Sequence, residues 1–335
     1  MRGGACAVRW VRQDARVSTP AREPLDADRL RRELLRPAGA WASLDVVPSV
    51  PSTNARLVEL ASHAARTGAG SGPGGLPAPA ALVAEHQTAG LGRAGRTWTT
   101  PPGAALTVSA LLRPQVPPER LGWLPLLSGL AVVRVLRDAG VAAALKWPND
   151  VLLPAAGPVP GLGAWRKVAG VLAQVVPAAP GARPPARGEA GRPGSVDVVV
   201  GIGLNVSQTA DELPVPTATS LALAGAGGGG SGARCLAGDR TGLLVALLRE
   251  LAAVVARWEA HGVGAAGAGG ETPLAEEYAA ASATLGQGVR VELAGGAGVI
   301  EGVAVRVDDD GALVVAGGDG ERVVAAGDVH HLRRA

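Results

Sequence analysis

The residue pattern changes near Gly286, and this change constrains the fold more than any other feature of the sequence. Upstream of it, stretches with helical periodicity alternate with short strand-like stretches. Downstream, only short β-type runs remain, and glycine-containing turns separate them. We expect these strands at 289–293, 299–307, 313–315 and 322–324. The pattern predicts a small β-barrel over residues 285–335, which forms a second domain.

The longer upstream part predicts an α+β domain with a mixed sheet, because helices interleave with strands that are mostly hairpin-like. We expect helices at 25–36, from Ser52 through Ala64, at 121–138 and at 239–261. Strands are expected at 44–47, 81–85, 105–112 (half-buried), 143–147, 150–153, 168–176 and 196–202. Gly/Pro/Ala-rich loops are expected at 68–80, 177–194 and 224–232. The organisation is therefore a tail with a short helix (1–40), a main domain (41–284) and the barrel (285–335).

Charge and cysteine content exclude several classes of protein. The net charge is only +3, and the arginines are scattered except for a run at 29–36 that is typical of a solvated helix face. The two cysteines, Cys6 and Cys235, form neither a disulfide framework nor a metal-binding spacing. No signal peptide or membrane span is evident. These features predict a soluble, cytoplasmic protein that does not associate with membranes.

The scarcity of lysine and asparagine marks a few positions. Only two of the 32 basic residues are lysines, Lys146 and Lys167, and the three asparagines are Asn54, Asn149 and Asn205. Such a composition is typical of strong pressure toward GC-rich codons. The lysines and asparagines that remain are therefore candidates for roles that arginine, serine or aspartate do not fill.

A loop rich in glycine and arginine is the densest functional pattern. Residues 85–98 contain three glycines, at 90, 92 and 95, which let backbone N–H groups approach an anion. Arg93 and Arg96 supply planar forks for carboxylate or phosphate, and Gln87 both donates and accepts hydrogen bonds, which suits a urea or amide. The glycine spacing matches the dinucleotide fingerprint, but an alternating strand follows instead of a helix, which argues against a Rossmann site. The Walker pattern is absent.

Four further segments carry polar residues at the ends of predicted elements. Residues 146–150 (Lys-Trp-Pro-Asn-Asp) place an ammonium, an amide and a carboxylate at a turn that suits phosphate and Mg²⁺. Lys167 opens an apolar strand. Residues 198–205 form an apolar strand that runs through Gly-Ile-Gly into Asn205. In Ser52-Thr53-Asn54, helix capping explains the first two residues and leaves Asn54 unexplained.

These five segments, in this order and followed by a small β-barrel, resemble the biotin–protein ligase family (biotin–[acetyl-CoA-carboxylase] ligases) over residues 44–332. The resemblance implies an α+β fold related to class II aminoacyl-tRNA synthetases, with an SH3-like C-terminal barrel. It also implies a reaction in which ATP and Mg²⁺ activate biotin to biotinyl-5′-AMP. Biotin then passes to one lysine of the biotin carboxyl carrier domain of an acyl-CoA or pyruvate carboxylase.

The resemblance also implies roles for individual residues. Lys167 and Arg93 would be catalytic, and Asp150 would bind the metal. The biotin-binding residues would be Ser52, Thr53, Asn54, Gln87, Gly90, Leu91, Gly92, Arg93 and Lys167. The ATP- and adenylate-binding residues would be Arg96, Trp98, Lys146, Asn149, Asp150 and Asn205.

Three positions depart from the family pattern. Leu91 and Ala94 stand where arginine is common, and Gln174 stands where glutamate is common. Two alternatives remain beside a biotin ligase: a lipoate- or octanoyl-transferring relative, and a biotin-sensing regulator that binds DNA. Only one helix is readable before Leu44, which is too little for a winged helix-turn-helix, so we expect no DNA-binding role. A homodimer is compatible with the resemblance.

Overall fold

The computed structural model describes residues 22–67, 76–177, 196–226 and 230–332. The expected tail up to residue 21, most of the 68–80 loop and the 177–194 loop lie outside the described residues. No helix in the described ranges is long and apolar enough to cross a membrane.

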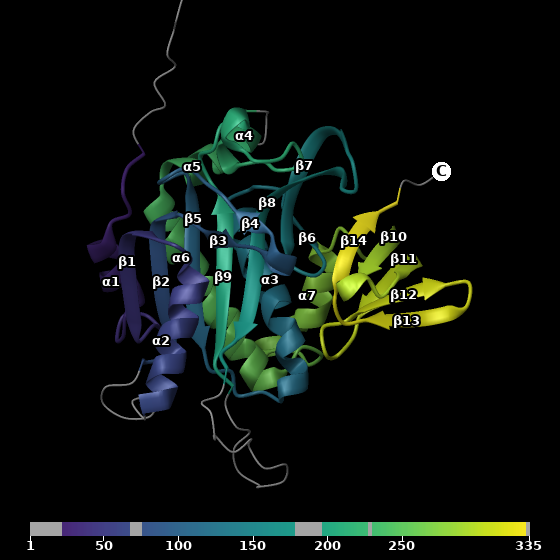
Figure 1. Ribbon diagram of the computed structural model, residues 1–335, viewed down its shortest axis with the longest axis horizontal. Coiled ribbons are helices and arrows are strands. Elements are labelled where there is room, and N and C mark those ends of the chain that lie inside the picture. The colour runs from purple at the N-terminus through teal and green to yellow at the C-terminus, as the bar shows by residue number, and fades with distance from the viewer. Residues whose placement is uncertain (1–21, 68–75, 178–195, 227–229, 333–335) are drawn as a thin grey trace, which may run out of the picture.

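A seven-stranded mixed sheet forms the centre of the main domain, as the sequence predicts (Figure 1). Its first two strands are parallel, and every other neighbouring pair is antiparallel. In spatial order the strands are β1 (Ser43–Val50), β2 (Ala80–Gln87), β5 (Ala105–Leu112), β9 (Val198–Asn205), β8 (Gly163–Val175), β7 (Asp150–Val159) and β6 (Ala144–Lys146). Strands β6, β7 and β8 follow one another along the chain as antiparallel hairpins, so short connections join them.

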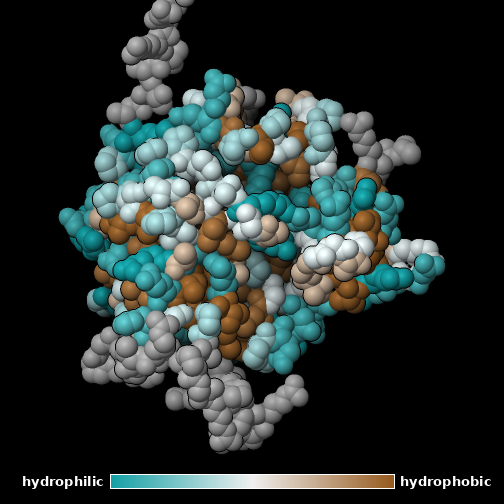
Figure 2. Space-filling model, viewed as in Figure 1, coloured by the Kyte–Doolittle hydropathy of each residue, from teal (hydrophilic) through white to brown (hydrophobic). Residues whose placement is uncertain are grey.

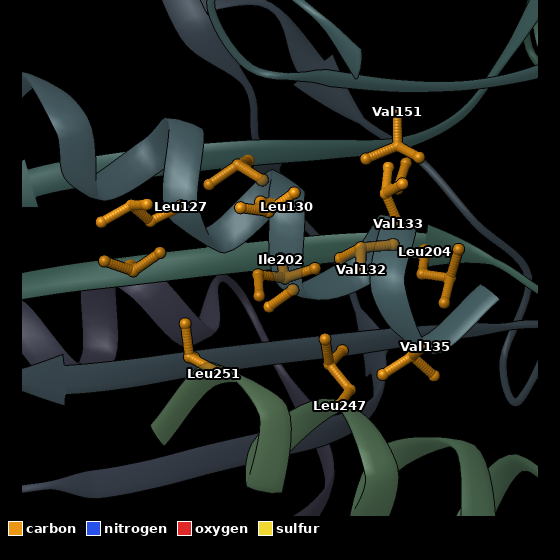
Figure 3. Close-up of a cluster of buried hydrophobic side chains, with 14 of the residues drawn as sticks. Leu127, Leu130, Val132, Val133, Val135, Val151, Ile202, Leu204, Leu247 and Leu251 are labelled. Atoms are coloured by element: carbon orange, nitrogen blue, oxygen red, sulfur yellow. The ribbon is translucent and has the colours of Figure 1, made fainter. Parts of the chain in front are cut away.

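Helices cover both faces of this sheet. On one face, α2 (Thr53–Thr67) packs through Leu57 and Ala61 against apolar residues of β2, β5 and β9. The larger core lies on the other face, where α3 (Trp123–Asp138) and α6 (Arg240–His261) pack against β9 and β7 (Figure 3). The same side carries α1 (Ala27–Leu34) and α7 (Leu274–Ala281). Asp239 caps α6 by accepting a hydrogen bond from the N–H of Gly242.

Side chains along the central strands point alternately to the core face and to the site face of the sheet. In β9, Val200, Ile202 and Leu204 enter the larger core, so the residues between them, Gly201 and Gly203, face the side of α2. Strand β5 alternates in the same way but is buried along its whole length. The expectation of a half-buried strand at 105–112 is therefore wrong. The polar residues that suggested an exposed face, Thr107 and Ser109, are buried and hydrogen-bonded.

The C-terminal segment forms a five-stranded antiparallel sheet beside the β6 side of the main domain (yellow in Figure 1). Its order is β13 (Gly320–Val324), β12 (Leu313–Gly317), β11 (Val299–Val307), β10 (Gly288–Leu293) and β14 (Gly327–His331). The sequence did not predict β14. Two indole N–H groups bind this sheet to the main domain: Trp147 donates to the carbonyl of Gly311 and Trp123 to that of Asp308, each at 3.0 Å.

Two helices replace part of an expected loop. Residues 224–232 were expected to be irregular, but α4 (Leu221–Ala226) and α5 (Gly230–Gly238) occupy much of this segment. Their glycines permit close packing: a Cβ on Gly225 would lie 2.7 Å from the side chain of Arg234. Tertiary packing thus overrides low helix propensity here. Helix α7 was also not predicted. Short 3₁₀ turns lie at Arg93–Gly95, Pro118–Gly122, Ala210–Glu212, Ala268–Gly270 and Ala294–Gly296.

Polar and apolar side chains are interspersed over the face of the molecule shown in Figure 2. Surface hydropathy alone therefore does not mark a site on this face.

Candidate functional site

A cavity of about 870 Å³ opens on the α2 side of the sheet. The five sequence segments meet there: four of them end a strand or begin a helix at this face, whereas Lys167 lies within β8 and does not open it as the sequence predicts. Of the predicted site residues, Gly90 alone does not line the cavity. Gly90 pairs with Trp98 across the small hairpin of β3 (Gly90–Leu91) and β4 (Thr97–Trp98), where a Cβ would lie 2.3 Å from the Trp98 carbonyl oxygen. The lining residues include Ser52, Thr53, Asn54, Gln87, Leu91, Gly92, Arg93, Arg96, Trp98, Lys146, Asn149, Asp150, Lys167 and Asn205.

Amide and hydroxyl groups are concentrated at one end of the cavity. The N–H and hydroxyl of Thr53 both approach Oε1 of Gln87, at 2.8 and 3.0 Å. Ser52 caps α2 through its hydroxyl, which accepts from the N–H of Ala55. Asn54 donates to the Leu172 carbonyl and to Gln174 Oε1. Gln174, one of the departures from the family pattern, is therefore a hydrogen-bond partner inside the wall.

The Gly/Arg loop crosses the mouth of the cavity. Between β3 and β4 it makes a tight turn in which Ala94 takes a left-handed conformation (φ 53°). Arg93 donates to Asn149 Oδ1 at 3.2 Å, and Asn149 in turn donates to the Val171 carbonyl. Burial lowers the pKa of Arg93, although the nearby carboxylates Asp328 and Asp150 oppose this effect. Leu91 lines the cavity and is largely exposed.

Two lysines and a carboxylate form the charged centre of the cavity. Lys167 Nζ lies 2.6 Å from Asp150 Oδ1 and 5.9 Å from the centroid of the Trp98 ring. Lys146 is buried at the end of β6, and desolvation lowers its pKa, while Asp150 acts in the opposite direction. The site therefore places two ammonium groups beside one carboxylate, and the burial of Lys146 strengthens its attraction for anions.

The indole of Trp98 covers the glycines of the sheet. A Cβ on Gly203 would lie 2.5 Å from its ring, and a Cβ on Gly170 would lie 3.5 Å away. Its Nε1 is buried without a hydrogen-bond partner in the described part of the chain. Asn205, beyond Gly203, donates to the Thr219 carbonyl and accepts from Gln208. A planar ligand with a polar edge fits this end of the cavity.

Two sets of residues in or behind the cavity wall were not predicted from the sequence. Ser109 on β5 contacts Thr53 and Asn54. Side chains alternate along a strand, which places Ser109 on the sheet face that carries the N-terminus of α2, so this alternation could have predicted the contact. The C-terminal sheet contributes Glu292, Asp328 and His330. Asp328 forms an ion pair with Arg96 of the Gly/Arg loop. No local sequence signal indicated this contact, because it depends on how the two domains pack.

Comparison with known proteins identifies relatives over nearly the whole chain. Residues 74–182 match the Biotin/lipoate A/B protein ligase family, and residues 284–332 match the Biotin protein ligase C terminal domain. The biotin–[acetyl-CoA-carboxylase] ligase of Mycobacterium tuberculosis is 38% identical over 93% of this chain and 97% of its own length. That of Paracoccus denitrificans is 32% identical over 79% of this chain and 91% of its own length.

A solved structure supports the fold. The Aquifex aeolicus biotin protein ligase, determined in complex with biotin and ATP, has a TM-score of 0.59 and 24% identity, and the match covers 88% of this chain and all of that one. Fold and site define a member of the biotin and lipoate protein ligases. Within this class, the chain belongs to the biotin–[acetyl-CoA-carboxylase] ligase family, on the strength of the full-length match to the mycobacterial relative.

Proposed function

We propose that this enzyme activates biotin with ATP to biotinyl-5′-AMP and transfers biotin to a lysine of a biotin carboxyl carrier domain. The observation that carries the proposal is the layout of one cavity. Amide and hydroxyl groups that suit a urea lie at one end, an indole over glycines lies at the other, and Lys167, Lys146 and Arg93 line the space between them.

The layout suits adenylation because that reaction joins two anions. The biotin carboxylate must attack the α-phosphate, and their repulsion must be offset by fixed positive groups. Lys167 is the best placed, since Asp150 and the Trp98 face hold its ammonium in the cavity. Arg93 and the N–H group of Leu91 would close over the carboxylate and the phosphate, while the N–H of Gly92 stabilises the loop turn by donating to the Arg96 carbonyl.

Thr53 and Gln87 would bind the ureido ring, and Trp98 with Asn205 would bind adenine. Lys146, Asn149 and Arg96 would support the phosphates, with Asn149 acting through the hydrogen bond that it accepts from Arg93. No covalent enzyme intermediate is required, because the adenylate stays bound until the carrier amine attacks.

Magnesium fits this site through a single protein carboxylate. No group of three or more potential metal ligands occurs among the described residues, but Mg²⁺ commonly binds one or two carboxylates together with substrate phosphates. Asp150 is the carboxylate that would hold it. The ion would neutralise phosphate charge.

We also propose how the chain divides into two domains. Residues 41–284 would form the catalytic domain, and residues 285–335 would complete the nucleotide end of its cavity through Asp328. The carrier domain of an acyl-CoA or pyruvate carboxylase is the proposed protein substrate.

One incubation tests the assignment. The enzyme is mixed with ATP, Mg²⁺, labelled biotin and a biotin carboxyl carrier domain, and label is expected on a single carrier lysine. A carrier in which that lysine is replaced by arginine is the matched control. Failure to label the carrier contradicts the proposal, and incorporation of lipoate or octanoate in a parallel reaction favours the alternative transferase.

A further inference from the structure

Ser109 connects the buried side of β5 to the cavity wall. Its side chain is completely buried, and its Oγ lies 2.7 Å from Thr53 Oγ1 and 2.6 Å from Asn54 Oδ1. Thr53 Oγ1 is in turn 3.0 Å from Gln87 Oε1. Three close contacts between oxygen atoms therefore form one chain from Asn54 to Gln87.

The backbone determines which amide atoms take part in this chain. The N–H of Thr53 donates to Gln87 at 2.8 Å, so the Gln87 atom at this position is the oxygen. Asn54 uses its amide nitrogen to donate to the Leu172 carbonyl at 3.0 Å, so its oxygen faces Ser109. Amide oxygens carry no proton. The three contacts therefore share only the two hydroxyl protons of Thr53 and Ser109.

The direction of the hydrogen bonds follows from which oxygen most needs a proton. Asn54 Oδ1 is buried, and Ser109 is the donor that the structure gives it. Gln87 Oε1 already accepts from the Thr53 N–H, and its contact with the Thr53 hydroxyl is the longest of the three. Buried polar atoms left unpaired are costly. Ser109 thus donates to Asn54, and Thr53 donates to Ser109.

In this arrangement the Thr53 hydroxyl directs only lone pairs toward the cavity. We propose that Ser109 is a positioning residue that holds Thr53 as a hydrogen-bond acceptor, and that the cavity thereby selects a ligand with a ring N–H, as in a cyclic urea. This inference rests on the proposed function, which supplies biotin as that ligand, and it assigns a specificity role to a residue that does not touch it.

The test measures the equilibrium binding of biotin and of two analogues, each with a different ring N–H replaced by CH₂. For the wild-type chain, the analogue that lacks the N–H facing Thr53 should bind about tenfold more weakly than biotin, as expected for one hydrogen bond. Ser109→Ala frees the Thr53 proton to point into the cavity. The ratio should then fall to about threefold or less, mainly because biotin binds more weakly.

Thr107→Val is the matched control. Thr107 is a buried residue on the same face of β5, and its hydroxyl donates to the Ala84 carbonyl at 2.6 Å and not to the Thr53 chain. This variant should keep the wild-type ratio. If Ser109→Ala does not fold, Ser109→Cys, which keeps the volume but is a weak donor, should lower the ratio in the same way.

Three results would overturn the inference: equal weakening of biotin and both analogues by the Ser109 variant, an equal fall of the ratio in Thr107→Val, or no discrimination by the wild-type chain that binds biotin. Wild-type protein that binds no biotin contradicts the proposed function instead, so the two failures are distinguishable.

Discussion

At the scale of single residues, three contacts hold Lys167 in the site. Its ammonium forms a short ion pair with Asp150 and lies over the Trp98 ring, and its backbone N–H donates to the Thr217 carbonyl. A cation held by several partners loses little freedom when it binds an anion, so it is suited to stabilise a transition state.

Lys167→Ala should lower the rate of pyrophosphate release with biotin and ATP by about 10²–10³-fold, because one charged donor is lost from the reacting centre. The thermal midpoint of unfolding should change little, since the side chain faces the cavity and not the core. Arg166→Ala is the control, because Arg166 neighbours Lys167 without lining the cavity. Near-normal pyrophosphate release by Lys167→Ala would refute this role.

The rarity of the three asparagines marked their positions but did not show what their side chains bind. All three line the cavity, as their rarity suggested, but each amide already binds protein groups. Asn54 bridges α2 to β8, Asn149 bridges the Gly/Arg loop to β8, and Asn205 binds Thr219 and Gln208. Rarity located these residues, but only hydrogen-bond geometry showed what their side chains contact.

At the scale of elements, β9 organises the site through its period of two. Its apolar residues enter the core, while Gly201 and Gly203 leave room on the other face for two different side chains. A Cβ on Gly201 would lie 2.2 Å from Asn54 Oδ1, and one on Gly203 would lie 2.5 Å from the Trp98 ring. One strand therefore supports both ends of the cavity.

Substitution of these glycines should separate the two substrates. Gly203→Ala should raise KM for ATP about tenfold with little change in KM for biotin, because the added methyl displaces Trp98. Gly201→Ala should do the reverse by displacing Asn54 from the biotin end. Steady-state kinetics with each substrate varied in turn would measure this, with circular dichroism as the check on folding. The assignment of the two ends is wrong if both variants raise the same KM.

At the scale of the whole molecule, the C-terminal sheet closes the cavity. Asp328 pairs with Arg96, and His331 lies against the main domain, with its Nε2 3.2 Å from Thr284 Oγ1. Burial, with the charges of Lys146 and His330, lowers the pKa of His331 to about 4. The domain contact thus holds a neutral histidine.

This histidine should make stability depend on pH. In the unfolded chain it titrates near 6.5, so as the pH falls the unfolded state binds the proton first, and the free energy of unfolding drops between about pH 6.5 and 4. Between pH 7.5 and 5, the wild type should therefore lose about 2 kcal/mol more stability than His331→Gln, which does not titrate. Urea unfolding at both pH values measures this.

His330→Gln is the comparison variant: it removes the smallest of the three causes that lower the pKa of His331, so it should keep most of the wild-type pH dependence. Equal pH dependence of His331→Gln and the wild type would show that His331 is not held neutral.

The sequence by itself determined most of the elements and the segments that form the site. Caps, glycine turns and apolar periodicity are local signals, and Asp239 and Gly262 mark the ends of α6 where the sequence predicts them. The order of five polar segments was likewise readable without a structure.

Only the tertiary structure decided which of these groups contact one another. Ser109 and Asn54 are 55 residues apart, and Arg96 and Asp328 are 232 apart. Burial of β5 on both faces, helix formation at 221–226 and 230–238, and the position of β14 all depend on such distant partners. The physical reason is that side-chain direction, desolvation and proton sharing are set by neighbours in space, which a local pattern does not specify.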